Sequence, residues 1–455
     1  MEEIISEIQL PEHWSWVELK DLTENSKDDI VDGPFGSNLK SSEYTETGIP
    51  VFKIQNIKEN RFVDKNINFV SPTKAEELSR HSFQKGDLII TKLGNPLGLC
   101  CKVPEKYPYG IIVADLMRFR PSTRRVVVQY LMYGINSVIV QNQFKAITKG
   151  TTRPRVNLTI VRGIKFPLPP LPEQRSIVSK IELLFSELDN GISNLKLAQE
   201  QLKVYRQAVL KKAFEGSVKV PFSDLVKSSQ NGISKRSGKE GVELKVLRLA
   251  DISNLEINYS SPRCIKLTSS EINKYKLLKD DLICIRVNGS KNLVGRLIIT
   301  SEKDDLNNWA FCDHFIRFSL DLSNAVPKYY YYYFHTMEVR QYIHENMVSS
   351  AGQNTVSQGT IKSVLVPFSS HSEQQAIVQE IETRLSVCDK IEQDIKDNLE
   401  KAEALRQSIL KKAFEGKLLN ERELAEVRGT EDWEPTEVLL EKIKAEKGQN
   451  GKNIH

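Results

Sequence analysis

The sequence has no long apolar segment. No stretch of its 455 residues approaches the roughly 18–20 apolar residues needed to cross a bilayer. The first ten residues, MEEIISEIQL, are acidic and offer neither the basic start nor the apolar core of a secretion signal. We therefore expect a cytoplasmic protein with no membrane partner.

Cysteine and histidine are also scarce. The six cysteines show no Cys-x-x-Cys spacing and the seven histidines form no ligand set, so the sequence predicts neither a disulfide framework nor a zinc site. The nearest grouping is Cys312, Asp313 and His314, which we interpret as a fragment of a strand rather than as metal ligands.

The motifs of nucleotide-dependent enzymes are missing. Segment 232–239 contains a Gly-Lys pair, but five residues separate its glycines and Glu240 stands where a phosphate-binding loop needs Ser or Thr. No Gly-x-Gly-x-x-Gly follows a predicted strand. Glu243 and Lys245, with Asp224 upstream, loosely resemble the carboxylate-plus-lysine site of metal-dependent nucleases. A single-chain nuclease is therefore kept as an alternative.

The composition is that of a globular protein, with 40% hydrophobic and 27% charged residues. The length allows two or three domains with cores of their own. Lys and Arg number 64 against 59 Asp and Glu, a net charge of +5. This small excess excludes a polybasic protein but leaves a locally basic surface possible.

An internal repeat is the strongest signal in the sequence. Residues 173–216 recur without a gap at 373–416, an offset of 200 residues. The two copies share a Glu-Gln pair, an Asp, an Arg-Gln pair and the closing seven residues LKKAFEG.

Each copy is predicted to form a long helix. The apolar seam of a coiled coil, in steps of three and four, is formed in the first copy by Ile181, Leu184, Leu188, Gly191, Leu195, Ala198, Leu202, Tyr205 and Val209. The second copy has Ile381, Cys388, Ile391, Ile395, Ala402, Leu405 and Ile409, with Arg384 and Asn398 interrupting the seam. Such a helix, roughly 60 Å long, has a narrow apolar stripe that it can bury only against another helix. The other copy of the repeat can provide that helix; a four-helix assembly between chains is the alternative.

The repeat divides the chain into five segments. They are a first globular domain (1–167), a central helix (168–216), a second globular domain (217–367), a C-terminal helix (368–420), and a tail (421–455) with a short helix and an end, from about Gly448, expected to be disordered. Short predicted strands with few helices make both globular domains α+β. The tyrosine run 329–333 is at helical spacing with the apolar residues after it, so we predict a core helix rather than a base-stacking surface.

The positive charge is concentrated in the two globular domains. Residues 34–165 carry 21 basic and nine acidic side chains, and residues 217–366 carry 20 and 15. By contrast, residues 1–33 carry two basic and ten acidic side chains, and residues 373–416 carry seven and ten. Each globular domain can therefore offer a basic surface to nucleic acid.

Several predicted loops of these domains mix basic residues with amide, hydroxyl and glycine residues. They are 53–56, 92–95, 151–155 and 286–291. Arg and Lys bind phosphates or guanine, and Asn and Gln bind adenine, so this mixture fits contact with DNA.

The order of motifs along the chain resembles that of the specificity subunits of type I restriction–modification enzymes. The motifs are LPEHWSWVELKDL at 10–22, DGPFGSNLKSSEY at 32–44, GIPVFKIQNI at 48–57, GDLIITKLG at 86–94, KGTTRPRVNLTIVRGIKFPLPPLPEQ at 149–174, the duplicated LKKAFEG, and WEPTEVLLEKIKAEK at 433–447. Together they cover both globular domains and both helices.

This resemblance implies an α+β fold class with two target-recognition domains separated by two long antiparallel coiled-coil helices. Each domain would recognise one half of a bipartite sequence in double-stranded DNA. The chain itself would be non-catalytic and bind no cofactor or metal; S-adenosylmethionine, ATP and Mg²⁺ would belong to partner methyltransferase subunits, expected as two copies, and to restriction–translocase subunits. A coiled-coil scaffold without nucleic acid is the second alternative.

The residues predicted to contact DNA lie in the loops that match the family by position. In the first domain they are Gly36, Ser37, Lys53, Gln55, Asn56, Lys92, Asn95, Thr151, Thr152, Arg153 and Arg155. In the second domain they are Arg286, Asn288, Ser290, Lys291, Gln353 and Asn354. The second domain lacks the GPFGS and LPPLPEQ forms, so the match of its loops is less direct.

Overall fold

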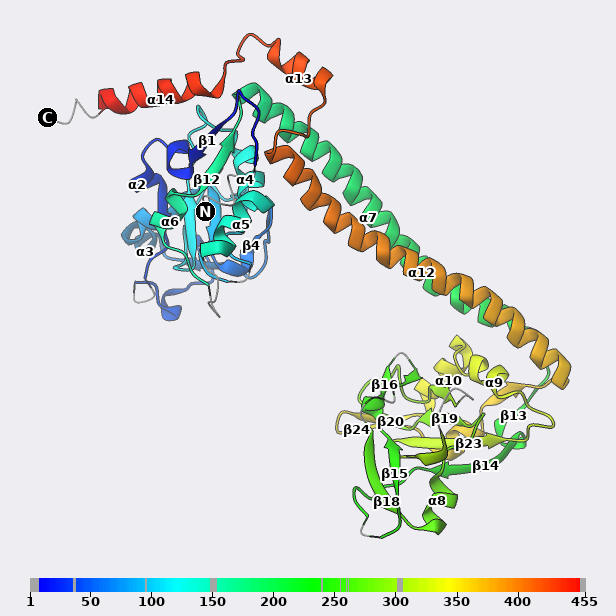
Figure 1. Cartoon of the computed structure of the whole chain (residues 1–455). Helices are drawn as coiled ribbons and strands as arrows, with labels where there is room; N and C mark the ends of the chain where they lie inside the picture. Colours follow the sequence, from blue (N-terminus) through cyan, green and yellow to red (C-terminus); the bar gives the residue numbers. More distant parts are fainter. Residues whose placement is uncertain are drawn as a thin grey trace. The chain divides into compact units, whose positions relative to one another are not determined.

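The computed structural model divides the chain into two compact units (Figure 1). Unit 1 comprises Met1–Ser193 and Asn398–His455, and unit 2 comprises Asn194–Asp397. The structure describes residues 8–35, 38–94, 96–147, 154–238, 240–253, 255–258, 260, 262–300 and 306–450, without the side chains of 307 and 444–450. No helix within these ranges is long and apolar enough to cross a membrane.

Unit 1 is an α+β domain, as predicted. One sheet has the strand order β6-β3-β10-β7 and a second has the order β2-β11-β8-β9. Strand β10 is parallel to β3, and the neighbouring pairs are antiparallel. The strands are β2 (Ile30–Asp32), β3 (Ile49–Phe52), β6 (Asn68–Val70), β7 (Ser82–Gln84), β8 (Leu88–Thr91), β9 (Cys100–Lys102), β10 (Tyr109–Ile112) and β11 (Leu116–Phe119), and the helices include α4 (Val128–Asn136), α5 (Val138–Ile147) and α6 (Leu158–Arg162). All four residues of strand β8 are buried, so both faces of this strand are covered by the rest of the domain.

Unit 2 repeats this plan. The sheet β14-β23-β19-β21 corresponds to β2-β11-β8-β9, and the sheet β18-β15-β22 corresponds to β6-β3-β10 with the same parallel pair, β15 and β22. The strands are β14 (Val226–Asn231), β15 (Val242–Leu247), β18 (Arg263–Leu267), β19 (Leu282–Ile285), β21 (Leu297–Ile299), β22 (Trp309–Phe311) and β23 (Phe315–Leu320). The two globular domains therefore share a topology although their sequences differ.

The two repeat copies form the helices α7 (Leu171–Ala213) and α12 (His371–Phe414). In unit 1 the beginning of α7 lies with the end of α12, and in unit 2 the end of α7 lies with the beginning of α12. The helices are therefore antiparallel, as predicted. Helix α7 begins two residues before the repeat, because Pro172 lies in its first turn, where a missing N–H breaks no helical hydrogen bond.

Repeated Arg and Asp residues form reciprocal pairs between the helices. In unit 2 Arg206 lies 2.7 Å from the carboxylate of Asp389, and in unit 1 Arg406 pairs with Asp189. An Asp and an Arg duplicated 200 residues apart can pair in this crossed way only between antiparallel helices. Each exposed pair stabilises the fold by less than about 1 kcal/mol, but together they favour this register.

The coiled-coil seam is narrower than the sequence predicted. The deeply buried positions of α12 recur at every seventh residue: Ile381, Cys388, Ile395, Ala402 and Ile409. In α7 they include Ile181, Leu202 and Val209. The prediction was wrong for Gly191, Tyr205, Ile391 and Leu405, which are exposed. Among the described residues the seam joins α7 to α12 alone, so the second row of each seam lies at the edge of the contact and stays partly in solvent.

The closing LKKAFEG of each copy anchors a helix end in a globular domain. Leu210 and Phe214 belong to the core of unit 2, and Leu410 and Phe414 belong to the core of unit 1. The ring centroid of Phe414 lies 4.8 Å from that of Tyr130, and that of Phe214 lies 5.0 Å from that of Tyr329. The seven identical residues therefore serve the same packing role twice.

The repeated glutamines hold equivalent positions. Gln174 and Gln374 are fully buried, and the side-chain oxygen of each accepts a 2.8 Å hydrogen bond, from the backbone N of Val127 and Val326 respectively. The preceding glutamates differ. Buried Glu173 accepts hydrogen bonds from Trp14 Nε1 at 2.9 Å and His13 Nε2 at 2.8 Å, whereas Glu373 caps Ser370 at its own helix start.

The tail contains two helices rather than the single short one predicted. These are α13 (Glu421–Arg428) and α14 (Thr436–Asn450), so the helical backbone extends past Gly448, where disorder was expected. Residues 451–455 lie outside the described part. Leu439 and Ile443 pack into the core of unit 1, and the hydroxyl of Thr436 donates to Leu168 O at 3.0 Å. These contacts make the beginning of α14 part of unit 1.

The tyrosine run forms a core helix, as predicted. Helix α9 (Pro327–Tyr333) buries Tyr329, Tyr330 and Tyr333, and the hydroxyl of Tyr333 donates to Leu365 O at 3.0 Å. A second helix, α10 (Met337–Asn346), follows after a break, so the apolar periodicity spans two helices. Burial raises the pKa of Tyr333 to about 12.

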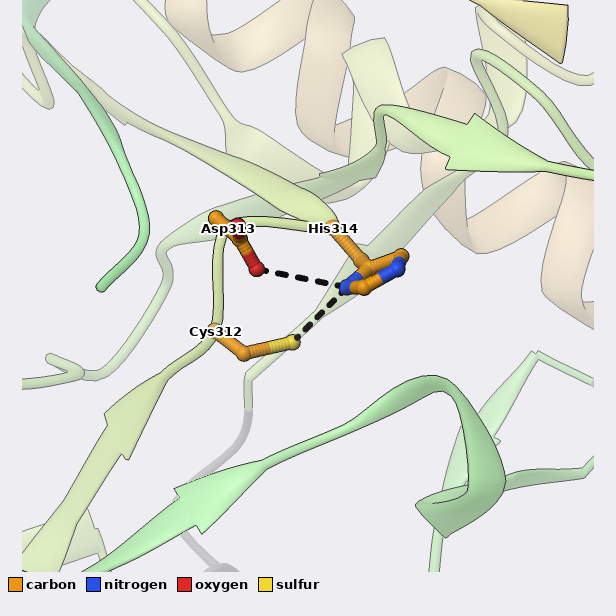
Figure 2. Close-up of side chains that lie close together, drawn as sticks. All are labelled: Cys312, Asp313 and His314. Carbon is orange, nitrogen blue, oxygen red and sulfur yellow. Dashed lines mark hydrogen bonds and ion pairs between the residues drawn. The ribbon is translucent and has the colours of Figure 1, made fainter. Parts of the chain in front are cut away.

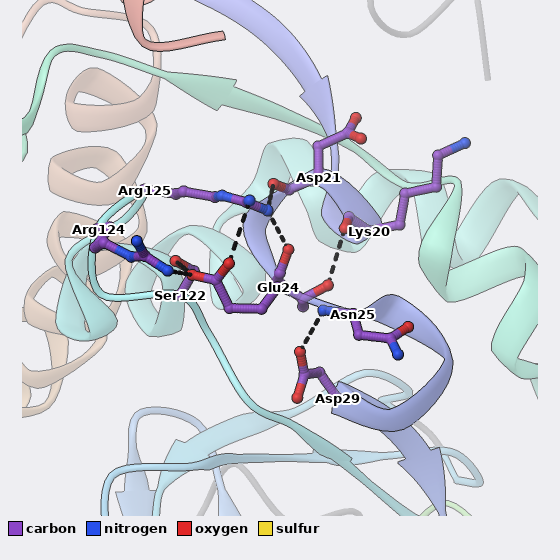
Figure 3. A network of polar contacts seen from close by, with 9 residues as sticks. Lys20, Asp21, Glu24, Asn25, Asp29, Ser122, Arg124 and Arg125 are labelled. Carbon is purple, nitrogen blue, oxygen red and sulfur yellow. Dashed lines mark hydrogen bonds and ion pairs between the residues drawn. The ribbon is translucent and has the colours of Figure 1, made fainter. Parts of the chain in front are cut away.

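A polar network in unit 1 links Glu24, near the beginning of the chain, to the segment before α4 (Figure 3). Glu24 accepts from the hydroxyl of Ser122 and pairs with Arg124 and Arg125, each at 3.3 Å. The hydrogen bond from Ser122 is the main reason why the pKa of Glu24 lies below its usual value. The acidic N-terminal segment therefore neutralises two cations of its own domain.

Candidate nucleic-acid interface

Two loops that the sequence predicted separately meet in unit 1. Leu93, after β8, forms an antiparallel bridge with Arg155, before α6. Beside it, Gly94 N donates to Pro154 O at 3.3 Å. A Cβ at Gly94 would lie 3.7 Å from the side chain of Ile54, so the loop 53–56 adjoins the same place. Three of the predicted loops thus converge on one site.

Two of the predicted cations are neutralised within this site. Lys92 is buried, and its ammonium lies 2.8 Å from the carboxylate of Asp32. The guanidinium of Arg155 lies 2.8 Å from the carboxylate of Asp115, but its side chain is 56% exposed. Arg155 can therefore still reach a phosphate, whereas Lys92 first has to leave its partner. Carboxylates at such a position can accept hydrogen bonds from cytosine N4.

Asn56 has a different role from the one predicted. It is buried at the end of a 3₁₀ turn (Ile54–Asn56), and its amide nitrogen donates to Val63 O at 3.0 Å and to Lys65 O at 2.9 Å. Its side chain therefore holds the turn. The same turn leaves Gln55 exposed and Lys53 half-buried, with the ammonium of Lys53 4.3 Å from the centre of the Tyr44 ring.

Several predicted contacts lie outside the described residues. They are Gly36, Ser37, Asn95, Thr151, Thr152 and Arg153. The residue before Gly36 is described: Phe35 is 77% exposed. Gly33 packs so closely against Val113 O that a Cβ would lie 2.1 Å away, which explains why a glycine opens this loop.

In unit 2 the predicted contacts gather on a small three-stranded sheet. Its strand order is β20 (Val287–Asn288), β25 (Gln353–Thr355) and β24 (Val348–Ser350). Gln353 is exposed next to the hairpin turn at Ala351 and Gly352, which both have positive φ. Asn354 is buried, and its amide donates to Gly289 O at 2.9 Å and to Asn288 O at 3.3 Å.

Asn354 therefore holds the loop after β20, as Asn56 holds its turn in unit 1, instead of facing DNA as predicted. Ser290 and Lys291 are exposed in this loop, and Asn288 accepts from Ser290 N at 2.8 Å. Arg286 is half-buried, and its guanidinium donates to Asp313 O at 3.3 Å.

Backbone hydrogen bonds show which residues correspond in the two sites. Lys92 N donates to Asp115 O and Arg286 N donates to His314 O, both at 2.8 Å. Val156 N donates to Lys92 O at 3.2 Å, and Val356 N donates to Arg286 O at 3.0 Å. Lys92 and Asp115 of unit 1 thus occupy the positions of Arg286 and His314 in unit 2.

The structure adds residues that sequence reasoning missed. In unit 2, Arg248 and Asp251 flank a 3₁₀ turn (Leu249–Asp251) that matches the turn after Lys53, and they pair at 2.7 Å. Asp32 and Asp115 complete the site of unit 1. No local motif marks these residues; aligning the two domains at an offset near 200 residues is the signal that could have found them.

Cys312 forms a parallel bridge with Ile233, whereas Asp313 and His314 lie in the turn between β22 and β23 (Figure 2), so the prediction of a strand fragment was wrong for these two residues. Cys312 Sγ lies 3.7 Å from His314 Nδ1, and Asp313 Oδ1 lies 3.3 Å from the same nitrogen. Burial raises the pKa of the Cys312 thiol, which opposes the thiolate that a metal requires.

The basic charge of both units is partly internal. Arg118 is buried and donates to Ser82 O at 2.7 Å, and Arg120 pairs with Asp87 at 2.8 Å. In unit 2 Arg340 is buried and donates to Val294 O at 2.8 Å. The charge sums of the sequence therefore overstate what each domain can offer to DNA.

The nuclease alternative gains no support. Glu243 and Lys245 lie on β15, whereas Asp224 lies before β14 in a different sheet, and the ammonium of Lys245 lies 5.7 Å from the centre of the Trp309 ring. Within the described residues, the group at 312–314 is the only set of three potential metal ligands that lie together.

The chain thus has a duplicated α+β domain, and in each copy basic and amide-bearing loops gather at corresponding positions. The chain belongs to the family of type I restriction modification DNA specificity domains, whose model matches residues 11–197 and 216–401.

The chain is similar to several specificity subunits over nearly its whole length. It is 29% identical to the type I restriction enzyme StySPI specificity subunit of Salmonella potsdam and 25% identical to the EcoKI specificity subunit of Escherichia coli K12. Each alignment covers 97% of both chains.

Two solved structures have the same fold at 20% identity. One, from a study of complex assembly and conformational transition of the type I R-M system, has a TM-score of 0.69 and covers 90% of this chain and all of its own. The other, the HsdS subunit from Thermoanaerobacter tengcongensis, has a TM-score of 0.59 and covers 91% and all of its own.

Proposed function

We propose that this chain is the specificity subunit of a type I restriction–modification complex and recognises a bipartite sequence in double-stranded DNA. Unit 1 recognises one half of the target and unit 2 the other. The observation that carries the proposal is the duplicated site: the two domains have one topology, and each places its loop, around Lys92 or around Arg286, at the corresponding position of its own fold.

The chain acts as a recognition subunit rather than as an enzyme. Its partners are methyltransferase subunits, in two copies, and restriction–translocase subunits, and it works in the cytoplasm. S-adenosylmethionine, ATP and Mg²⁺ bind to those partners and not to this chain. The antiparallel helices support this proposal. Each helix has a surface that does not pack into a globular core, and the fixed register of the pair holds this surface in place for a partner subunit.

Within each site the exposed and half-buried residues contact DNA, and the buried amides hold the loops. In unit 1 Lys53, Gln55 and Arg155 are the contacts among the described residues. In unit 2 they are Arg286, Asn288, Ser290, Lys291 and Gln353. Lys and Arg in such loops bind phosphates, and Gln and Asn side chains bind base edges.

Methylation mapping tests the proposal directly. The chain is reconstituted with its methyltransferase partner, DNA is methylated, and modified sites are sequenced. We expect one bipartite sequence, with neither methylation nor cleavage by the chain alone. Gln353→Ala should alter one half-sequence and leave the other unchanged, whereas Arg155→Ala should reduce methylation and its dependence on salt. Methylation without regard to sequence contradicts the proposal.

A further inference from the structure

The turn that joins β22 to β23 occupies a central position in the site of unit 2. His314 O accepts from the backbone N of Arg286 at 2.8 Å and from that of Val287 at 3.4 Å. Val287 begins β20, the strand that carries Asn288 and pairs with the hairpin β24–β25. The turn is therefore attached to the sheet that presents the predicted contacts, although its own sequence suggested no role.

The corresponding position in unit 1 is Asp115, and its side chain is engaged. Asp115 pairs with Arg155, the residue before Val156. In unit 2 the residue before Val356 is Thr355, which has no charge to offer. The sequence position that carries Arg155 in unit 1 is therefore occupied by a neutral residue in unit 2, so His314 has no counterpart of the pair that holds Asp115.

The His314 ring has one nitrogen engaged and one free. Nδ1 faces Cys312 and Asp313 (Figure 2), which fixes the ring from one side. Nε2 has no partner within the part of the chain that the structure describes, and the side chain is 48% exposed. An imidazole held in this way presents a single hydrogen-bonding atom with little remaining freedom.

We propose that His314 recognises one base pair of the half-target bound by unit 2, through a hydrogen bond from or to Nε2 at a base edge in the major groove. The inference rests on the proposed function. It is favoured over a phosphate contact because the neighbouring Arg286 and Lys291 already supply cations. It is favoured over a metal site because the guanidinium of Arg286 donates to the same turn, at Asp313 O.

The test uses the reconstituted complex with the methyltransferase partner, and methylation mapping as the readout. His314→Ala is compared with His344→Ala, a matched histidine that is exposed on α10 of the same unit and outside the site. We expect His314→Ala to lower discrimination at one base pair of one half-target by about 5- to 100-fold, with the other half unchanged. His344→Ala should leave the target unchanged.

Two further variants make the result decisive. His314→Asp, which introduces the residue of unit 1, should change the preferred base at that one position. His314→Gln is close in size and replaces the Ala variant if that variant unfolds. Unchanged preference in all His314 variants, or a uniform loss of methylation with every preference retained, overturns the inference. A wild-type complex with no bipartite target instead contradicts the proposed function.

Discussion

Truncating the Phe414 side chain should promote local unfolding of the C-terminal end of α12 in unit 1. The ring is fully buried between Tyr130 and Phe166, at centroid distances of 4.8 and 6.1 Å. The packing is tight: a Cβ on Gly134 would lie 2.7 Å from the Phe414 ring. Phe414→Ala therefore leaves a cavity that its neighbours cannot fill, and the cost is about 3–5 kcal/mol.

The matched residue in unit 2 provides the control. Phe214 packs against Tyr329 and Tyr333 at 5.0 and 5.1 Å. Phe214→Ala should destabilise unit 2 by a similar amount and leave the amides of 398–414 unaffected.

Hydrogen exchange resolved along the chain measures both effects, and is preferable to a single unfolding free energy because the chain has two units. For Phe414→Ala we expect the slow amides of 398–414 to exchange about 100- to 3,000-fold faster, since 1.4 kcal/mol corresponds to a factor of ten. Amides of unit 2 should be unaffected. Exchange in 398–414 that equals that of the wild type, or an equal change in both units, would refute the reasoning.

Three further outcomes follow from the same structure. Gly416→Ala should lower the stability measured by thermal unfolding more than Gly216→Ala does. Both glycines have φ near +75°, where a Cβ destabilises the fold by about 1 kcal/mol, but only at Gly416 would the Cβ also lie 2.4 Å from Pro11. Equal losses of stability would show that the N-terminal segment does not pack there. Exchanging the charges of Arg406 and Asp189 together should retain more stability than either single change, by up to about 1 kcal/mol in a double-mutant cycle; strictly additive losses would mean no coupling. Burial lowers the pKa of His335 to about 4, so below pH 6.5 the folded state binds fewer protons than the unfolded state. The free energy of unfolding of unit 2 should therefore fall by up to about 3 kcal/mol as the pH falls from 6.5 to 4. His335→Gln should remove this pH dependence, and a variant that retains the pH dependence of the wild type would contradict the assignment.

The two long helices were predictable because their signal is local and repeated. A helix needs only its own periodicity and its terminal residues, and LKKAFEG with Gly216 and Gly416 supplied the ends. The width of the seam was not predictable. Tyr205 and Leu405 fit the heptad pattern, but their burial depends on how many helices pack together, which the pattern does not state.

The candidate site was predictable in its loops but not in its individual side chains. Basic and amide residues mark the loops around Lys92 in unit 1 and around Arg286 in unit 2, and within each unit the structure brings the marked loops together. Asn56 and Asn354 matched the composition of a DNA contact, yet both are buried and bond to backbone carbonyls. A polar side chain that holds a loop and one that faces a ligand have the same composition, so only the fold distinguishes them.

The sequence by itself determined the duplication and the two long helices, because each depends on periodicity or on identity between segments. Short predicted strands indicated the α+β class of both domains, and the antiparallel arrangement of the helices came only from the resemblance to the specificity subunits. Tertiary structure alone decided which duplicated residues keep one role. Gln174 and Gln374 make the same contact, whereas Glu173 binds His13 and Trp14, and Glu373 caps its own helix. It also placed His314 where unit 1 has Asp115, since pairing between distant strands, and not neighbourhood in the chain, sets which side chains share a site.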